Sequence, residues 1–296
     1  METLFYVLQQ SINGLQLGVV YALIALGYTM VYGVLRLINF AHGDIFMFGA
    51  FVAYYLIARF NVPIYLVFLI TATITGLLGF LVEKIAYRPI RRAPKIALLI
   101  TAVGVSLFLE YFLSLNALFT PNYIAFPRPF EVEGYDLGPL TITNMQVIIF
   151  AVTGVSLVLL YLLVYKTKYG RAMRAVSHDQ EVAALMGINV DAIISFTFVV
   201  GTALAGIGGI LYAFAYPQIN VFMGIMPGIK SFIAAVLGGI GLIHGAVVGG
   251  IIIGVSEVYV SAFLSSTLRD GFIFVILLAV LLLKPSGLFG KRVDKV

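Results

Sequence analysis

Residues 145–165 read MQVIIFAVTGVSLVLLYLLVY and contain no charged side chain. The hydrocarbon core of a bilayer, about 30 Å thick, is crossed by about 20 apolar residues in an α-helix. This stretch is long enough to cross, and it lacks the one-sided apolar pattern of a helix on the surface of a soluble protein. It predicts a transmembrane helix.

Seven further apolar runs make the same prediction for most of the chain. They cover residues 4–32, 44–57, 64–82, 96–115, 192–216, 229–263 and 272–283. Overall, 61% of the 296 residues are hydrophobic and 10% are charged, against about 25% charged in a typical soluble domain. We therefore expect an all-α, polytopic transmembrane helical bundle of about eight segments, forming a single domain over residues 1–296.

Two of these regions contain polar residues and glycines that interrupt a helix. The first interruption comprises Asn39, His42, Gly43 and Asp44, and the second comprises Gly238, Gly239, Gly241, His244 and Gly245. Non-helical backbone at membrane depth is tolerated only where protein or a water-filled cavity covers it. Both regions are therefore predicted to be broken or re-entrant and to face the interior of the bundle.

Basic residues between the apolar runs predict the orientation. They form three groups: Lys84, Arg88, Arg91, Arg92 and Lys95; Lys166, Lys168, Arg171 and Arg174; and Lys284, Lys291, Arg292 and Lys295. Short loops rich in Lys and Arg face the cytoplasm, so these loops and the C-terminus are expected there, with residues 116–144 and 217–227 outside. Eight complete crossings do not fit this arrangement, and one segment is expected not to cross fully.

Several classes of function are disfavoured. The net charge of +5 resides in loops that orient a membrane protein, so we do not expect binding to nucleic acid. The absence of cysteine excludes disulfides, thiolate nucleophiles and Cys-ligated metals, and we predict no metal site and no catalytic residue. No G-x-x-x-x-G-K-[ST] phosphate loop occurs within these residues, so the chain is not expected to be an enzyme or to bind ATP as a cofactor.

The loop 166–191 contains the signals of one short helix. Ser177 followed by Gln180 has the S-x-x-Q form of a capping box, Asp179 and Glu181 suit the positive N-terminal end of a helix, and Gly187 is placed to end it.

This helix has one apolar face. Val182, Leu185 and Met186 are spaced i, i+3 and i+4 and share that face. A short amphipathic helix held between two membrane spans suits docking into a groove of another protein. The alternative is that its apolar side chains rest on neighbouring loops of the same chain.

Ionisable side chains at membrane depth are costly unless they meet a cavity or a partner. Asp44, together with Asn39, His42 and Gly43, forms a polar cluster where a helix breaks, and could line a path for the charged groups of an amino acid. The alternative is a structural turn near the membrane interface. Glu110 and Glu257 are further candidates for the path, with a subunit interface or the headgroup layer as alternatives.

Six stretches carry a resemblance to a known family. They are YALIALGYTMVYGVLRLINFAHGD (21–44), EKIAYRPIR (83–91), GRAMRAVSHDQEVAALMGIN (170–189), SFTFVVGTALAGIGGIL (195–211), KSFIAAVLGGIG with HGAVVGG (230–241 and 244–250) and KPSGLFG (284–290). Together they resemble the membrane subunit of the branched-chain amino acid (Leu/Ile/Val) ABC transporters. Members of that family often have Pro where this chain has His244, so no role is assigned to this histidine.

The resemblance implies a channel-forming permease of an ATP-driven importer in the bacterial or archaeal plasma membrane. Its expected partners are a second homologous permease subunit, two cytoplasmic ATPase subunits that bind the ATP, an extracytoplasmic substrate-binding protein and membrane lipid. In that setting the helix formed by Ser177, Gln180, Glu181, Val182, Leu185 and Met186, ending at Gly187, resembles the coupling helix that contacts the ATPase.

Other functions remain open at this point. Close relatives of the family are thought to import urea, short amides or other amino acids, and apolar walls alone do not select among these. A self-sufficient secondary transporter or channel would use Asp44, Glu110 or Glu257 as an ion or proton site. An intramembrane enzyme is disfavoured because no paired catalytic constellation is present.

Overall fold

The computed structural model describes residues 2–35, 39–91, 93–115 and 122–290. Its helices are α1 (Glu2–Leu35), α2 (His42–Ala58), α3 (Ile64–Val82), the π-helical turn η1 (Glu83–Tyr87), α4 (Lys95–Leu113), α5 (Asn144–Lys166), α6 (Lys168–His178), α7 (Gln180–Leu185), α8 (Val190–Ala215), α9 (Ile225–Gly238), α10 (Ile243–Phe263) and α11 (Arg269–Leu283). Each of the eight predicted apolar runs overlaps at least one of these helices.

Within the described ranges, six helices are long and apolar enough to cross a membrane: α1, α3, α4, α5, α8 and α10. Helices α2 and α9 are shorter and also apolar. The prediction of an all-α polytopic bundle is confirmed. The chain is a multi-pass membrane protein.

The long run 229–263 is divided into two helices, α9 and α10. Gly239 and Gly241 lie in the turn between them with φ of 104° and 96°, which glycine adopts at little cost because it has no Cβ. The predicted break is therefore confirmed at these two residues. His244 and Gly245 are part of α10 and do not interrupt it.

The first predicted interruption needs a similar correction. His42, Gly43 and Asp44 form the first turn of α2 and do not break a helix. In the described part of this region, the non-helical stretch is 39–41. The polar residues therefore lie at a helix start, where the first backbone N–H groups have no partner within the helix.

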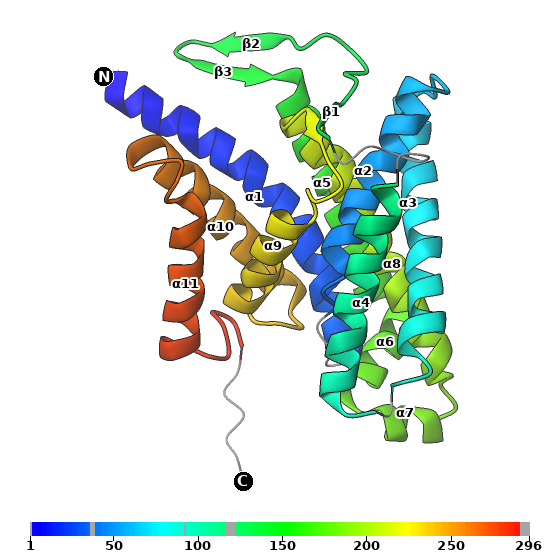
Figure 1. Ribbon diagram of the computed structural model, residues 1–296. Coiled ribbons are helices and arrows are strands. Elements are labelled where there is room, and N and C mark those ends of the chain that lie inside the picture. The colour runs from blue at the N-terminus through cyan, green and yellow to red at the C-terminus, as the bar shows by residue number, and fades with distance from the viewer. Residues whose placement is uncertain (1, 36–38, 92, 116–121, 291–296) are drawn as a thin grey trace.

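The division into α9 and α10 also explains why eight complete crossings did not fit the predicted sides of the basic loops and the C-terminus. The start of α1 and the hairpin of β2 and β3 lie at one end of the bundle, whereas α6, α7 and the end of α11 lie at the other (Figure 1). The conflict arose because the run 229–263 was counted as one crossing. Of the basic residues used for the orientation, Arg92, Lys291, Arg292 and Lys295 lie outside the described residues.

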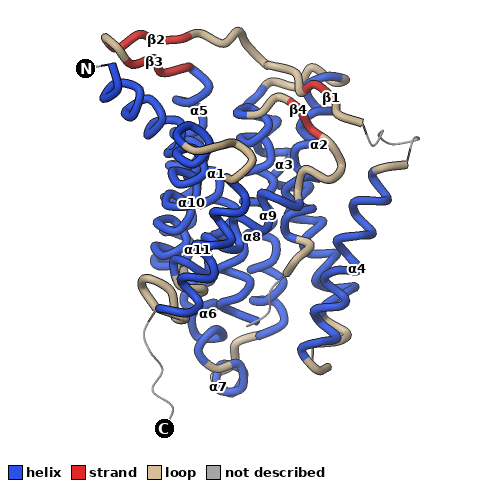
Figure 2. Tube along the Cα trace, turned by 60° about the vertical axis from the view of Figure 1, so that its left-hand side comes forward, coloured by secondary structure: helices blue, strands red, loops and turns tan. Residues whose placement is uncertain are grey.

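Short strands cover the end of the bundle where α1 begins (Figure 2). Strand β1 (Ile124–Ala125) pairs antiparallel with β4 (Gln218–Ile219), and β2 (Gly134–Leu137) pairs antiparallel with β3 (Leu140–Thr143). The pairing of β1 with β4 joins the two segments predicted to lie on the same side of the membrane.

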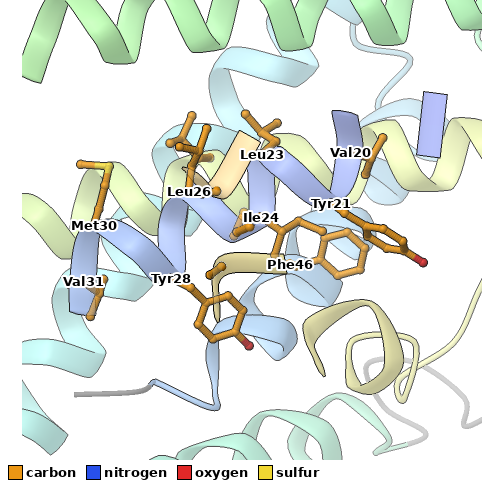
Figure 3. Close-up of a cluster of buried hydrophobic side chains, with 14 of the residues drawn as sticks. Val20, Tyr21, Leu23, Ile24, Leu26, Tyr28, Met30, Val31 and Phe46 are labelled. Carbon is orange, nitrogen blue, oxygen red and sulfur yellow. The ribbon is translucent and has the colours of Figure 1, made fainter. Parts of the chain in front are cut away.

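Helix α1 forms the centre of the bundle and packs against α8, α9 and α10. Most of its membrane segment is buried. Figure 3 shows Tyr21 and Tyr28 on the same side of α1 as Phe46 of α2, with Leu23 and Leu26 on the opposite side. In contrast, α4 and α11 lie at the periphery, on either side of α9 (Figure 1).

Candidate functional site

Two buried carboxyl groups meet between α2 and α4. Asp44 lies in the first turn of α2 and is 2% exposed, and Glu110 lies near the end of α4 and is 5% exposed. The Asp44 carboxyl lies beside the Ser106 hydroxyl and the Glu110 carboxyl. The two acids, which the sequence places in separate apolar runs, therefore adjoin one another inside the bundle.

A small cavity of ≈ 170 Å³ opens beside this pair. Asp44, Gly43 and Ser106 contribute to its wall, and the rest is mostly apolar: Tyr28, Phe40, Val103, Gly224, Ile225, Gly228, Ile229 and Phe232. These residues belong to α1, α2, α4, α9 and the segments that precede α2 and α9. The cavity therefore combines an acidic group with walls that suit an aliphatic side chain.

The other members of the predicted polar cluster do not line this cavity. His42 is completely buried, and its ring lies 4.5 Å from that of Tyr28. Asn39 is also buried, and its Oδ1 accepts a hydrogen bond of 2.7 Å from the Tyr87 hydroxyl of η1. The structure thus places Gly43 and Asp44 at the cavity, and Asn39 and His42 in contacts within the protein.

Glu257 belongs to a separate buried charge cluster. Its Oε1 lies 2.6 Å from Lys230 Nζ, and its Oε2 accepts a hydrogen bond of 2.8 Å from the Tyr21 hydroxyl. Lys230 Nζ also lies 2.7 Å from Asp270 Oδ1, and Arg269 Nε lies 3.9 Å from Glu257 Oε1. Two acids and two bases therefore balance here and connect α1, α9, α10 and the start of α11.

The Glu257 cluster adjoins a larger cavity of ≈ 420 Å³, lined by Tyr6, Gln10, Asn13, Gln16, Leu17, Ala215, Tyr216, Glu257, Val258, Ser261, Ala262 and Arg269. Lys230 was missed as a site residue at the sequence level. The available signal was a single cation within an apolar stretch, which implies an acidic partner.

The loop 166–191 contains two helices, and the first, α6, was not predicted. The cap of α7 also differs from the prediction. Ser177 belongs to α6, and its Oγ donates to the Arg174 carbonyl. The capping residue is Asp179, whose Oδ1 accepts from the backbone N–H groups of Glu181 and Val182 at 2.9 and 3.0 Å. A carboxylate serves this role at least as well as a hydroxyl, so the S-x-x-Q pattern was misleading.

The remaining predicted residues of this loop lie as expected on α7 or at its ends. Val182, Leu185 and Met186 are 54, 86 and 78% exposed, so their apolar face does not rest on neighbouring loops. Gln180 Nε2 donates to the carbonyl of Val34 at 2.9 Å, which joins the start of α7 to the end of α1. Gly187 follows the helix with φ of 80°, as predicted for its C-terminal residue.

Comparison with known proteins identifies the family. Residues 10–281 match the family described as "Branched-chain amino acid transport system / permease component". The chain belongs to this family. The resemblance of the six sequence stretches is thereby confirmed.

Curated relatives of this permease family match along the whole chain. The high-affinity branched-chain amino acid transport system permease protein LivH of Escherichia coli K12 is 40% identical over 100% of this chain and 99% of the relative. The corresponding protein BraD of Pseudomonas aeruginosa is 38% identical over the full length of both. A probable branched-chain amino acid transport permease of Methanocaldococcus jannaschii is 32% identical over 90% of this chain and 88% of the relative.

A solved structure shares the fold. PsaBC from Streptococcus pneumoniae in complex with Fab superposes with a TM-score of 0.52 at 14% identity, covering 94% of this permease and 92% of that chain. At this identity the likeness concerns the fold alone.

Proposed function

We propose that the chain is the channel-forming permease subunit of an ATP-driven ABC importer for branched-chain amino acids. It works in the plasma membrane of a bacterium or archaeon, with α7 and the C-terminus in the cytoplasm. It pairs with a second homologous permease subunit, receives substrate from an extracytoplasmic binding protein and is driven by two cytoplasmic ATPase subunits. The observation that carries this proposal is the exposed apolar face of α7.

The position of α7 supports a docking role. Its exposed residues Val182, Leu185 and Met186 lie at the end of the bundle where basic loop residues gather, which is the cytoplasmic side by the positive-inside rule. Exposed apolar side chains that lie together favour a partner that removes them from water. A groove on a cytoplasmic ATPase is such a partner, and it supplies the phosphate loop that this sequence lacks.

The cavity at Asp44 supports the substrate class. An amino acid with an aliphatic side chain needs an acceptor for its ammonium group and an apolar wall for its side chain. Asp44 and Ser106 provide polar contacts, and the phenyl ring of Phe232 with Ile225 and Ile229 provides the apolar wall. Urea and short amides carry no aliphatic side chain that would use this wall.

The test is to place a charge on the apolar face of α7. In proteoliposomes that contain the assembled transporter, Val182→Asp or Leu185→Asp is expected to abolish uptake of radiolabelled leucine, because a carboxylate cannot be buried in an apolar groove. Val132→Asp is the matched control, since Val132 is also exposed but precedes β2 at the opposite end. Normal leucine uptake in both α7 variants would contradict the docking role.

The carboxyl pair gives a specific reason to test a second function. Two adjoining acids inside the bundle, Asp44 and Glu110, would also suit a proton-coupled secondary transporter. In that case leucine uptake by this chain alone would follow a proton gradient, and Glu110→Gln would abolish it. The proposed importer requires the ATPase subunits instead.

A further inference from the structure

A charge cluster built around the buried Glu83 connects two segments at the α7 end of the bundle. Glu83 of η1 has a fully buried side chain and forms an ion pair with Arg91, which follows η1. Arg91 Nη1 also lies 2.5 Å from Asp191 Oδ1 on α8, and Arg88 forms an ion pair with the same carboxylate. The Ser195 hydroxyl donates a hydrogen bond of 2.6 Å to Glu83 Oε2. The two negative and two positive charges attract one another, which favours contact between the η1 segment and the start of α8.

One side of this cluster is joined directly to α7. Asp191 is the second residue of α8, and only Met186, Gly187, Ile188 and Asn189 separate α8 from α7. This connection is itself ordered by hydrogen bonds: Ile188 N–H donates to the Ala183 carbonyl at 3.1 Å, and Asn189 Oδ1 caps α8 by accepting from Ala192 N–H at 3.0 Å. A displacement of α7 therefore reaches Asp191 through a short connection.

The other side is joined to the helices that hold the carboxyl pair. From η1, the Tyr87 hydroxyl donates to Asn39 at 2.7 Å, immediately before the turn that starts α2 and Asp44. From Arg91 the chain reaches Pro94, the N-cap of α4, which carries Glu110. Because α4 packs chiefly against α2 and η1, its position depends on these contacts.

From this arrangement we infer that Glu83, Arg88, Arg91 and Asp191 form a mechanical joint that transmits the movement of α7 to α2 and α4. The four residues act as positioning residues: none of them lines the cavity, and they hold η1 and the start of α8 together as one body. The movement then changes the relation of Asp44 to Glu110 at the cavity. This inference rests on the proposed function, because the movement of α7 is attributed to an ATPase.

The first test separates transmission from assembly. In proteoliposomes with the complete transporter, Asp191→Asn is expected to lower leucine uptake per ATP hydrolysed by about tenfold, within the range of coupling energies between distant sites, while ATP hydrolysis continues. Lys84→Gln is the control, because Lys84 lies in η1 but outside the cluster. An unchanged ratio of leucine to ATP in Asp191→Asn would overturn the inference.

The second test uses the absence of native cysteine. Arg88 and Asp191 have side chains that are 43 and 45% exposed, so a reagent can reach both positions. The double variant Arg88→Cys with Asp191→Cys is expected to be uncoupled while its thiols are free, and to regain coupling after reaction with a short flexible thiol crosslinker. Each single cysteine variant, treated alike, stays uncoupled.

Two outcomes of these experiments have different meanings. A fully crosslinked double variant that remains as uncoupled as the free thiols would overturn the joint, because a covalent link should replace the ion pairs. A wild-type transporter that shows no ATP-dependent leucine uptake would instead contradict the proposed function.

Discussion

The buried cluster around Glu257 predicts a large loss of stability in the variant Lys230→Met. Lys230 and Glu257 have side chains that are 5 and 6% exposed, and their charged atoms are 2.6 Å apart. Methionine keeps the length and apolar stem of lysine but removes the charge. Glu257 would then retain only the Tyr21 hydroxyl at 2.8 Å and Arg269 at 3.9 Å.

The magnitude follows from leaving one buried charge without its main partner. Removing one member of a buried ion pair costs about 3–5 kcal/mol. For a chain of this size, a loss of that order lowers the melting temperature by on the order of 10 °C. Asp270 adds little to this loss, because its side chain is 38% exposed and can turn toward water.

The assay is thermal unfolding of the purified permease in detergent, followed by the fraction that stays monodisperse after heating. The double variant Lys230→Met with Glu257→Gln removes both charges, so it is expected to recover more than half of the loss. Lys166→Met, at an exposed lysine, is the control and is expected to change stability by less than about 0.5 kcal/mol. The reasoning would be refuted by equal melting temperatures for Lys230→Met and wild type, or by a double variant that is less stable than Lys230→Met.

Three further predictions follow from local geometry. Asp179→Ala removes the cap of α7 and should weaken that helix by about 1 kcal/mol, which hydrogen exchange of its first amides would show as a faster rate. Ser177→Ala should leave the exchange rate unchanged, and the reverse ranking of the two variants would contradict the cap assignment. A Cβ at Gly254 would lie 2.2 Å from a backbone nitrogen of α1, whereas one at Gly154 would meet nothing within 4 Å; Gly254→Ala should therefore lower the melting temperature in detergent and Gly154→Ala should not. A cysteine in place of Leu4, at the start of α1, should react with an impermeant thiol reagent from outside the cell, and labelling only after lysis would contradict the orientation.

Most of the fold was predictable because apolar length is a strong signal. The runs in the sequence coincide with helices, and the glycines at 239 and 241 correctly marked a break, since glycine is the residue that adopts positive φ without strain. The number of crossings was harder to predict. The glycines in the run 229–263 predict a break, but the run was still counted as one crossing, whereas the structure divides it into α9 and α10.

The candidate site was predicted less completely, because its residues meet through tertiary contacts. Asp44 and Glu110 were each recognisable as acids within apolar segments, but nothing in the sequence pairs them. Glu83 and Asp191 were not predicted as site residues, yet Glu83 is fully buried and both acids pair with Arg91. At α7, the capping-box pattern favoured Ser177, whereas Asp179, which was expected only to suit the positive end of the helix, is the residue that caps it.

The central claim is that this permease moves its substrate only when separate ATPases drive it. The most direct test measures accumulation of radiolabelled leucine in two sets of vesicles, one with the assembled transporter, binding protein and ATP, the other with this chain alone under an imposed proton gradient. The account predicts accumulation in the first set, its loss when ATP is replaced by a non-hydrolysable analogue, and none in the second. Accumulation by the single chain under the proton gradient would contradict it.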